Sequence, residues 1–122
     1  MGKNKSYKRG EIYYVKCNNA VGSEQTKERP CLILQTNTAN IFGSTITIAP
    51  ISKTRRKLPT HVWIDRTESN GLKYDSSIKC DQVTTVDSIR LTNQIGVIED
   101  ELLPKIDRAL YKHLAMKKKH LF

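Results

Sequence analysis

The stretch VGSEQTKERPCLILQTN, residues 21–37, decides the fold of this chain. A polar turn runs into an Arg-Pro pair and then into a short apolar run, which is typical of a buried strand opened by proline. The stretch APISKTRRKLPTHVWI, residues 49–64, adds a strand, a basic loop and a second strand. Together they predict a rigid β-framework that displays basic and hydroxyl side chains toward a polyanion. These side chains belong to Arg29, Ser52, Thr54, Arg55, Arg56 and Lys57.

Short segments on either side continue the β pattern. Residues rich in Tyr, Val, Ile and Thr alternate with polar ones between turn signals, which is typical of half-buried strands. Strands are expected at 10–17, 30–35, 44–49, 61–65, 77–79 and 94–98, with a further strand or its exit at 82–85. Asp87 is expected to cap one short helical turn.

The last segment predicts a helix. Its apolar residues recur at i+4, at Leu102, Ile106, Leu110 and Leu114, and they form one stripe that packs on the rest of the chain. Acidic residues open this segment and lysines follow it, which matches the helix dipole. The sequence therefore predicts a mainly β chain with one α-helix (α+β), a small and strongly curved antiparallel sheet closed by a C-terminal helix.

Length and composition bound the remaining possibilities. A chain of 122 residues fits one domain, so we expect a basic, flexible N-terminal arm over residues 1–9 and a single domain over 10–122. No apolar run reaches the ~18–20 residues of a membrane helix, and no signal-peptide segment follows the start. The three cysteines are widely spaced without a CxxC motif. We therefore predict no metal, no cofactor and a reducing, cytoplasmic location.

The net charge of +9 is unevenly distributed. Residues 1–60 contain 11 Lys/Arg and 3 Asp/Glu, a balance of +8, whereas residues 61–122 contain 10 and 9, a balance of +1. A positive field of this kind raises the local concentration of phosphates and speeds encounter with nucleic acid. Ordinary solubilising charge is the alternative interpretation. The charge favours a polyanionic partner without identifying it.

One reaction that such a basic site could serve is RNA cleavage without a metal, which needs a base for the 2′-OH, an acid for the 5′-oxygen and a cation for the crowded phosphorane. Arg29 is the leading candidate for the cation, because a guanidinium can form two hydrogen bonds to one phosphate. Its position before Pro30 predicts a rigid strand entrance. An ion pair with Glu24 or Glu28 is the alternative role for Arg29. A hydroxyl from Ser52 is expected to bond the same phosphate.

The basic run 53–57 and the aromatic and histidine side chains each allow two interpretations. The run is either a solvated loop or a phosphate contact, and its position between a Ser/Thr strand and Leu58-Pro59 favours phosphate. His61 suits acid–base chemistry by its side-chain type, but a lone histidine within a strand is more often structural. Trp63 and Tyr13 either stack on bases or belong to the core.

Several segments taken together resemble the MazF/PemK family of toxin endoribonucleases over residues 8–115. They are KRGEIYYV, VGSEQTKERPCLILQ, the API-S segment, KLPTHV, the CDQV-T stretch before Asp87 and the acidic start of the final helix. The resemblance implies an SH3-like barrel that forms a homodimer and cuts single-stranded RNA without a metal. It also implies products with a 2′,3′-cyclic phosphate and a 5′-hydroxyl.

The resemblance also assigns site residues. The family's catalytic arginine maps onto Arg29 and its Ser/Thr partner onto Ser52, with Thr54 as a rival because the spacing to Leu58 is shortened. Asp81 stands where relatives often have Glu, and Thr26 to Glu28 stand where many have glycines. The implied RNA-binding residues are Glu24, Gln25, Gln35, Thr36, Lys53, Thr54, Arg55, Arg56, Lys57, Leu58, Pro59, Thr60, Asp81 and Gln82.

The resemblance finally implies a cognate antitoxin. The surface that attracts RNA also attracts an acidic polypeptide, so we expect a partner whose acidic, disordered tail covers the basic groove. The competing functions are a non-catalytic barrel toxin that poisons gyrase and a plain nucleic-acid-binding module. Arg29 together with Ser52 argues against the gyrase poison, which does not need that pair. The plain binding module predicts affinity for nucleic acid without turnover.

Overall fold

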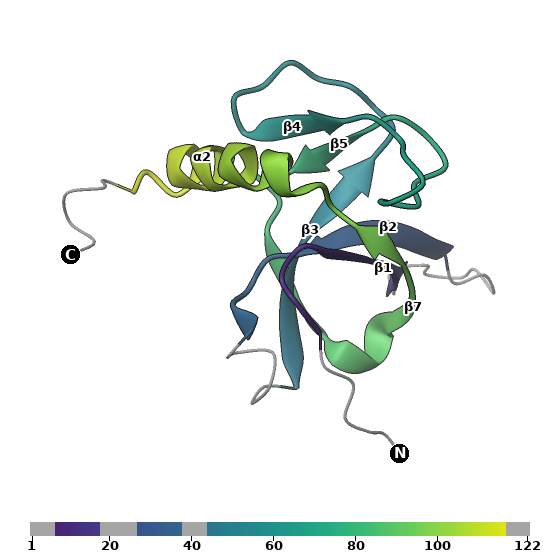
Figure 1. The fold of residues 1–122 in the computed structure, drawn as a ribbon. Helices are drawn as coiled ribbons and strands as arrows, with labels where there is room; N and C mark the ends of the chain where they lie inside the picture. The colour runs from purple at the N-terminus through teal and green to yellow at the C-terminus, as the bar shows by residue number, and fades with distance from the viewer. Residues whose placement is uncertain (1–6, 18–26, 38–43, 117–122) are drawn as a thin grey trace.

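The computed structural model describes residues 7–17, 27–37 and 44–116. In these ranges seven strands precede a C-terminal helix (Figure 1). The strands are β1 (Glu11–Cys17), β2 (Lys27–Ile33), β3 (Thr45–Ser52), β4 (His61–Ile64), β5 (Ser76–Lys79), β6 (Thr84–Asp87) and β7 (Leu91–Val97). The helical elements are the 3₁₀ turns η1 (Ser88–Arg90) and η2 (Asp100–Leu102) and the α-helix α2 (Leu103–His113).

All strand pairings are antiparallel, in the order β4-β5-β3-β2-β1-β7, with β6 pairing β3 as well. The long strand β3 organises the sheet, because its first half pairs β6 and its last two residues pair β5. The predicted antiparallel sheet with one C-terminal helix is therefore confirmed. Within the described ranges β4 and β7, the two ends of this order, do not pair with each other.

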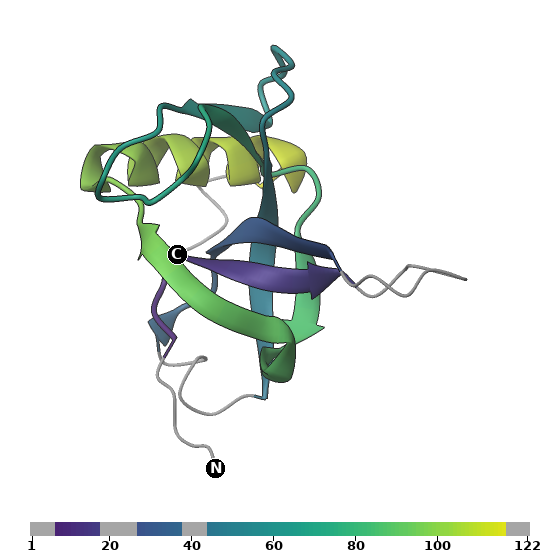
Figure 2. The ribbon, with the colours of Figure 1, turned by 90° about the vertical axis from the view of Figure 1, so that its right-hand side faces the viewer.

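Two apolar clusters cover the two faces of the sheet. Alternation along a strand sends neighbours to opposite faces, so Ile12 belongs to the first cluster and Tyr13 to the second. The first cluster includes Ile106 and Ala109 of α2, which Figure 2 shows running beside the β4–β5 end of the sheet. The helix thus buries its apolar stripe against strands that are distant in sequence.

Several predicted boundaries need correction. The strand predicted at 30–35 begins earlier, at Lys27, so Arg29 lies inside β2 opposite Val15 rather than at the strand entrance. The strand predicted at 82–85 lies at 84–87. The Asp87 cap is confirmed, since its carboxylate accepts a hydrogen bond from the Ile89 backbone at 3.1 Å. Leu114 lies beyond the end of α2 and is exposed, because the helix ends at His113.

Residues 7–9, the first that the structure describes, are anchored more firmly than a flexible arm would be. The buried ring of Tyr7 packs edge-on against Tyr13, with 5.1 Å between ring centroids. Arg9 donates to the Leu34 carbonyl at 3.2 Å and pairs with Asp107 of α2. Residues 7–9 therefore belong to the folded body, which corrects the predicted arm at these positions; residues 1–6 lie outside the described ranges.

Cys31 and Cys80 are fully buried, and burial raises the pKa of each thiol to about 12. Both stay protonated near neutral pH and act as small core residues. No helix in the described part of the chain is long and apolar enough to cross a membrane.

Candidate functional site

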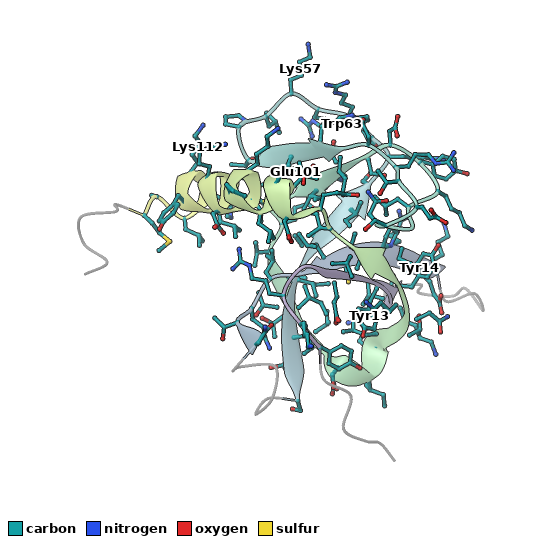
Figure 3. The ribbon with its side chains drawn as sticks, viewed as in Figure 1. Tyr13, Tyr14, Lys57, Trp63, Glu101 and Lys112 are labelled. Carbon is teal, nitrogen blue, oxygen red and sulfur yellow. The ribbon has the colours of Figure 1, made fainter. Side chains whose placement is uncertain are left out.

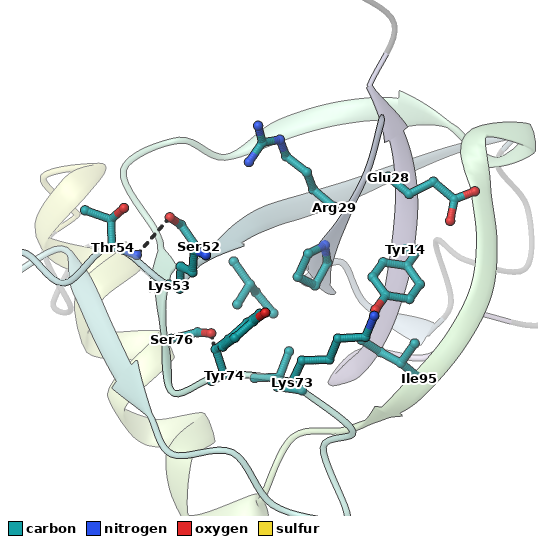
Figure 4. A pocket seen from close by; sticks show the side chains of 13 residues that line it. Tyr14, Glu28, Arg29, Ser52, Lys53, Thr54, Lys73, Tyr74, Ser76 and Ile95 are labelled. Carbon is teal, nitrogen blue, oxygen red and sulfur yellow. Dashed lines mark hydrogen bonds between the residues drawn. The ribbon is translucent and has the colours of Figure 1, made fainter. Parts of the chain in front are cut away.

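A cavity of about 340 Å³ lies where the first half of β2 and the last residues of β3 meet the segment that joins β4 to β5 (Figure 4). Strand β1 and strand β7 each contribute one lining residue. The cavity is lined by Tyr14, Glu28, Arg29, Pro30, Ile51, Ser52, Lys53, Thr54, Leu72, Lys73, Tyr74, Ser76 and Ile95. It therefore brings together the arginine and both hydroxyls that the sequence predicted as catalytic.

Arg29 is exposed on β2, and the strand fixes its backbone through pairing with Val15. In Figure 4 its guanidinium points toward the side of Ser52 and Thr54, whereas Glu28 points away. Within the described ranges Arg29 forms no ion pair, and Glu24 lies outside them. A guanidinium that has no ion pair among the described residues, and that lines one cavity with two hydroxyl side chains, is suited to binding an anion.

Ser52 is the last residue of β3, and its Oγ accepts a hydrogen bond from the Thr54 backbone at 3.2 Å. This bond folds the chain sharply after the strand, so that both hydroxyls line the same cavity. Among the described residues the Ser52 hydroxyl donates to no acceptor, so its hydrogen can be donated to a ligand. The geometry thus keeps Ser52 and Thr54 together without choosing between them.

Aromatic contacts hold the basic loop between β3 and β4 at two points. The Lys53 ammonium lies 4.7 Å from the Tyr74 ring centroid, and the Arg55 guanidinium lies 4.3 Å from that of Trp63. Cation–π contacts of this kind orient the charged groups while leaving them near water. Figure 3 shows Lys57 at the outer tip of the loop, above Trp63.

His61 and Asp81 form a second polar group beside this loop. The imidazole Nε2 lies 2.9 Å from the Asp81 carboxylate, and only 3% of the histidine side chain is exposed. Its Nδ1 is buried and has no hydrogen-bond partner within the described residues. Burial on β4 supports the structural interpretation of His61, and the sequence did not reveal Asp81 as its partner.

Comparison with known proteins agrees with this geometry. Residues 8–114 match the sequence pattern of the family described as PemK-like, MazF-like toxin of type II toxin–antitoxin system. The chain belongs to this family. It is also 40% identical over 111 residues to endoribonuclease EndoA of Bacillus subtilis (strain 168), a match that covers 89% of this chain and 95% of EndoA. The predicted resemblance is confirmed, and the chain takes its place among the endoribonuclease toxins.

Solved structures of similar proteins support the fold of this toxin. Mycobacterium tuberculosis toxin MazF-mt6 is 28% identical, with a TM-score of 0.75 over 88% of this chain and 98% of that one. An endoribonuclease in complex with its cognate antitoxin, from a mycobacterial species, is 22% identical, with a TM-score of 0.76 over 91% and 97% of the two chains. At that identity the second comparison supports the fold alone.

The toxin's other predicted RNA contacts divide into three groups. Thr60 lies beside the Asp81–Gln82 turn, because its carbonyl accepts from the Cys80 backbone at 3.0 Å. This bond gathers Leu58, Pro59, Thr60, Asp81 and Gln82 at one end of the β4–β5 hairpin. By contrast, Gln35 bonds the Thr45 carbonyl and the Thr47 amide at the opposite end of β3. That end lies ~23 Å from Ser52, so Gln35 and Thr36 are not brought to the cavity; Glu24 and Gln25 lie outside the described ranges.

Sequence reasoning missed the cavity's third wall. Lys73 and Tyr74 reach the site from the segment between β4 and β5, and Ser76 reaches it from the start of β5. Tyr14 and Ile95 reach it from β1 and β7. Within the described residues, no three His, Cys, Asp or Glu side chains lie close enough together to hold a metal ion. The sequence signal nearest to this wall was the turn Ser69-Asn70-Gly71, which predicts a tight loop just before Lys73.

Replacing the two hydroxyls separately should show which one serves the phosphate. Ser52 is held by strand pairing with Ser77, whereas Thr54 lies beyond the strand. Ser52→Ala should therefore lower the rate of RNA cleavage by about 10- to 100-fold, the effect of losing a hydrogen bond to a charged group, and Thr54→Ala by much less. Single-turnover cleavage of one RNA oligonucleotide measures both variants. A larger loss in Thr54→Ala would assign the role to Thr54 instead.

Proposed function

We propose that this toxin cuts single-stranded RNA in the Arg29 cavity without a metal ion. The 2′-oxygen of the substrate attacks the adjacent phosphorus, the bond to the 5′-oxygen breaks, and the products carry a 2′,3′-cyclic phosphate and a 5′-hydroxyl. The observation that carries the proposal is that Arg29, Ser52 and Thr54 line the same cavity. Family membership supports the class of reaction.

The cavity supplies what the transition state needs most. Attack by the 2′-oxygen places five oxygens around phosphorus and concentrates negative charge on the non-bridging ones. Arg29 can bond two of these oxygens at once, and Ser52 or Thr54 can donate a further hydrogen bond. Lys53 and Lys73 line the same cavity and add positive charge. The charge is thus stabilised by side chains that are in place before the reaction.

The metal-free chemistry has a direct test. Cleavage of a long single-stranded RNA should proceed at the same rate in EDTA, because the cationic partners are Arg29 and lysines. The fragments should have 5′-hydroxyl ends, which polynucleotide kinase labels without prior phosphatase treatment. Double-stranded RNA of the same sequence should resist, because the A-form helix hides its base edges and holds the 2′-OH away from in-line attack.

An Arg29→Ala preparation purified in parallel controls for contaminating ribonucleases in this test. Loss of activity in EDTA with recovery in magnesium would contradict the metal-free proposal.

Substrate binding is proposed to extend from the cavity along the basic loop. Arg55, Arg56 and Lys57 are exposed there and follow Ser52 closely in sequence. Side chains of this type bind phosphates and give affinity that falls with salt. The group at the end of the β4–β5 hairpin, residues 58–60 with Asp81 and Gln82, is proposed to contact bases.

The proposed partner is an antitoxin with an acidic tail that occupies the same groove. Support comes from the concentration of positive charge in residues 1–60 and from membership of a family described as toxins of type II toxin–antitoxin systems. Apolar anchors on that tail would add affinity that charge alone does not supply. We also propose that the toxin is a cytoplasmic homodimer, because a two-fold axis beside the groove lengthens the RNA track.

An SH3-like barrel remains our proposal for the finer description of the fold. The Val97 amide on β7 donates to the Ser69 carbonyl at 3.0 Å, in the segment between β4 and β5. This bond supports closure, since it connects elements from the two ends of the strand order.

A further inference from the structure

Tyr74 is a large aromatic side chain that the fold leaves open to solvent. It is 56% exposed, although it lies in the wall of the Arg29 cavity rather than at a chain end. Figure 4 shows its ring on the side of the cavity opposite Arg29, close to Lys53 and Ser76. Exposed aromatic rings beside phosphate-binding cations are the usual stacking surfaces for unpaired bases.

The backbone beneath this ring is held rigidly. The Ser76 hydroxyl donates to the Tyr74 carbonyl at 2.7 Å, and the Asp75 carboxylate accepts from the Arg66 amide at 2.8 Å. Further along the same segment, the fully buried Asn70 accepts from the Leu72 amide at 3.1 Å and donates to the Asp65 carbonyl at 2.9 Å. A ring that is exposed on a fixed backbone is ready to bind without ordering first.

Lys53 orients the ring from above. Its ammonium lies 4.7 Å from the Tyr74 ring centroid, and it directly follows Ser52 in sequence. The contact therefore ties the aromatic wall to the hydroxyl that faces the phosphate. Lys53 lies over one face of the ring, and more than half of the Tyr74 residue is still exposed to solvent.

From these contacts we infer that Tyr74 is the stacking platform for a nucleobase next to the scissile phosphate. The inference rests on the proposed function, because it places the base beside the phosphate that Arg29 holds. Stacking at this position fixes the nucleotide whose 2′-oxygen or 5′-oxygen takes part in the reaction. Tyr74 is thus a positioning residue for RNA, and Lys53 supports it through the cation–π contact.

Variants at Tyr74 separate stacking from other roles. Tyr74→Ala should lower kcat/KM for a single-stranded RNA oligonucleotide by about 10- to 100-fold, the usual effect of losing one stacked base. Tyr74→Phe should stay within about twofold of the parent, because the ring remains, and Tyr74→Leu should resemble Tyr74→Ala. Tyr111→Ala, which removes a half-buried tyrosine from α2 outside the cavity, is the matched control and should leave cleavage unchanged.

Fluorescence of 2-aminopurine, an adenine analogue whose emission falls on stacking, tests the contact without turnover. A set of RNA oligonucleotides carries the probe at one position each, and Arg29→Ala protein keeps them uncut. One position should be quenched by Arg29→Ala and by Arg29→Ala/Tyr74→Phe but not by Arg29→Ala/Tyr74→Ala. Removing the base at that position should cost the parent about the same factor in kcat/KM as Tyr74→Ala, and should cost Tyr74→Ala nothing more.

The outcomes distinguish this inference from the proposed function. If the parent cuts RNA and Tyr74→Ala cuts it equally well, the stacking platform is overturned and the cleavage site stands. Equal losses in Tyr74→Phe and Tyr74→Ala would also overturn it, because the hydroxyl would then be the active group. If the parent cuts no RNA, the proposed function falls, and the quenching pattern alone decides whether Tyr74 stacks on a base.

Discussion

Arg29→Ala should lower the rate of RNA cleavage by about 10²-fold or more, the effect of removing one preorganised donor to a developing oxyanion. RNA binding should change far less, because the lysines of the cavity and the loop arginines remain. The difference arises because the extra negative charge that Arg29 stabilises develops on the phosphate oxygens in the transition state and is absent from the bound substrate. Single-turnover rates and the dissociation constant of an uncleavable RNA, measured at one salt concentration, give the two quantities.

The loop arginines provide the matched comparison. Arg55→Ala and Arg56→Ala should each weaken RNA binding and reduce the salt slope of the affinity by about one, with a smaller effect on the rate of bound RNA. Replacing Arg55 also removes its cation–π contact with Trp63, so the Arg56 variant reports the loss of a phosphate contact more directly. Near-normal turnover by Arg29→Ala would move the chemistry to another residue.

Gly96→Ala should lower the free energy of unfolding by about 3 kcal/mol, the upper range for overpacking a tight site. A Cβ at this position on β7 would lie 2.3 Å from the carbonyl carbon and oxygen of Asn70 and 2.5 Å from the Ser69 oxygen. All three are backbone atoms, so no flexible side chain can move aside. The segment that carries Tyr74 would have to shift, and RNA cleavage should fall with stability. Equilibrium unfolding in guanidinium chloride measures the effect.

Asn93→Ala on the same strand is the control for this prediction. Asn93 is exposed, so its replacement should change the free energy of unfolding by less than about 0.5 kcal/mol. A Gly96→Ala protein as stable as the Asn93→Ala protein would show that the segment between β4 and β5 yields easily, contrary to the rigid wall described for the cavity.

The sequence predicted the sheet, the final helix and the Arg29–Ser52–Thr54 group because these features depend on local pattern. Alternation along β3 and the i+4 spacing in α2 reflect which face is buried, and the basic loop follows β3 directly. The start of β2 was predicted too late in the sequence. The first half of this strand is exposed, and its charged residues at 27–29 lack the apolar pattern that predicts a strand. Local composition cannot reveal that pairing with β1 continues through them.

The remaining site residues depend on contacts between distant segments. The His61–Asp81 contact joins residues 20 positions apart, and the Tyr74 wall forms only when the β4–β5 segment folds toward β2 and β3. Gln35 was predicted as an RNA contact, and the sequence did not reveal that its side chain bonds the β3 backbone. Predicting these requires the strand order, which is not readable from residue type alone.

The link between Arg9 and Asp107 bears on how the toxin is made. It joins the first described residues to the last helix, and α2 also completes the apolar cluster that contains Ile12 of β1. The Arg29 cavity likewise needs Ile95 of β7 in its wall. A nascent chain that stops before α2 therefore lacks part of the core, although every residue that lines the cavity has already been synthesised. We expect such a chain to show little activity until Ile106 and Ala109 of α2 can pack into this cluster.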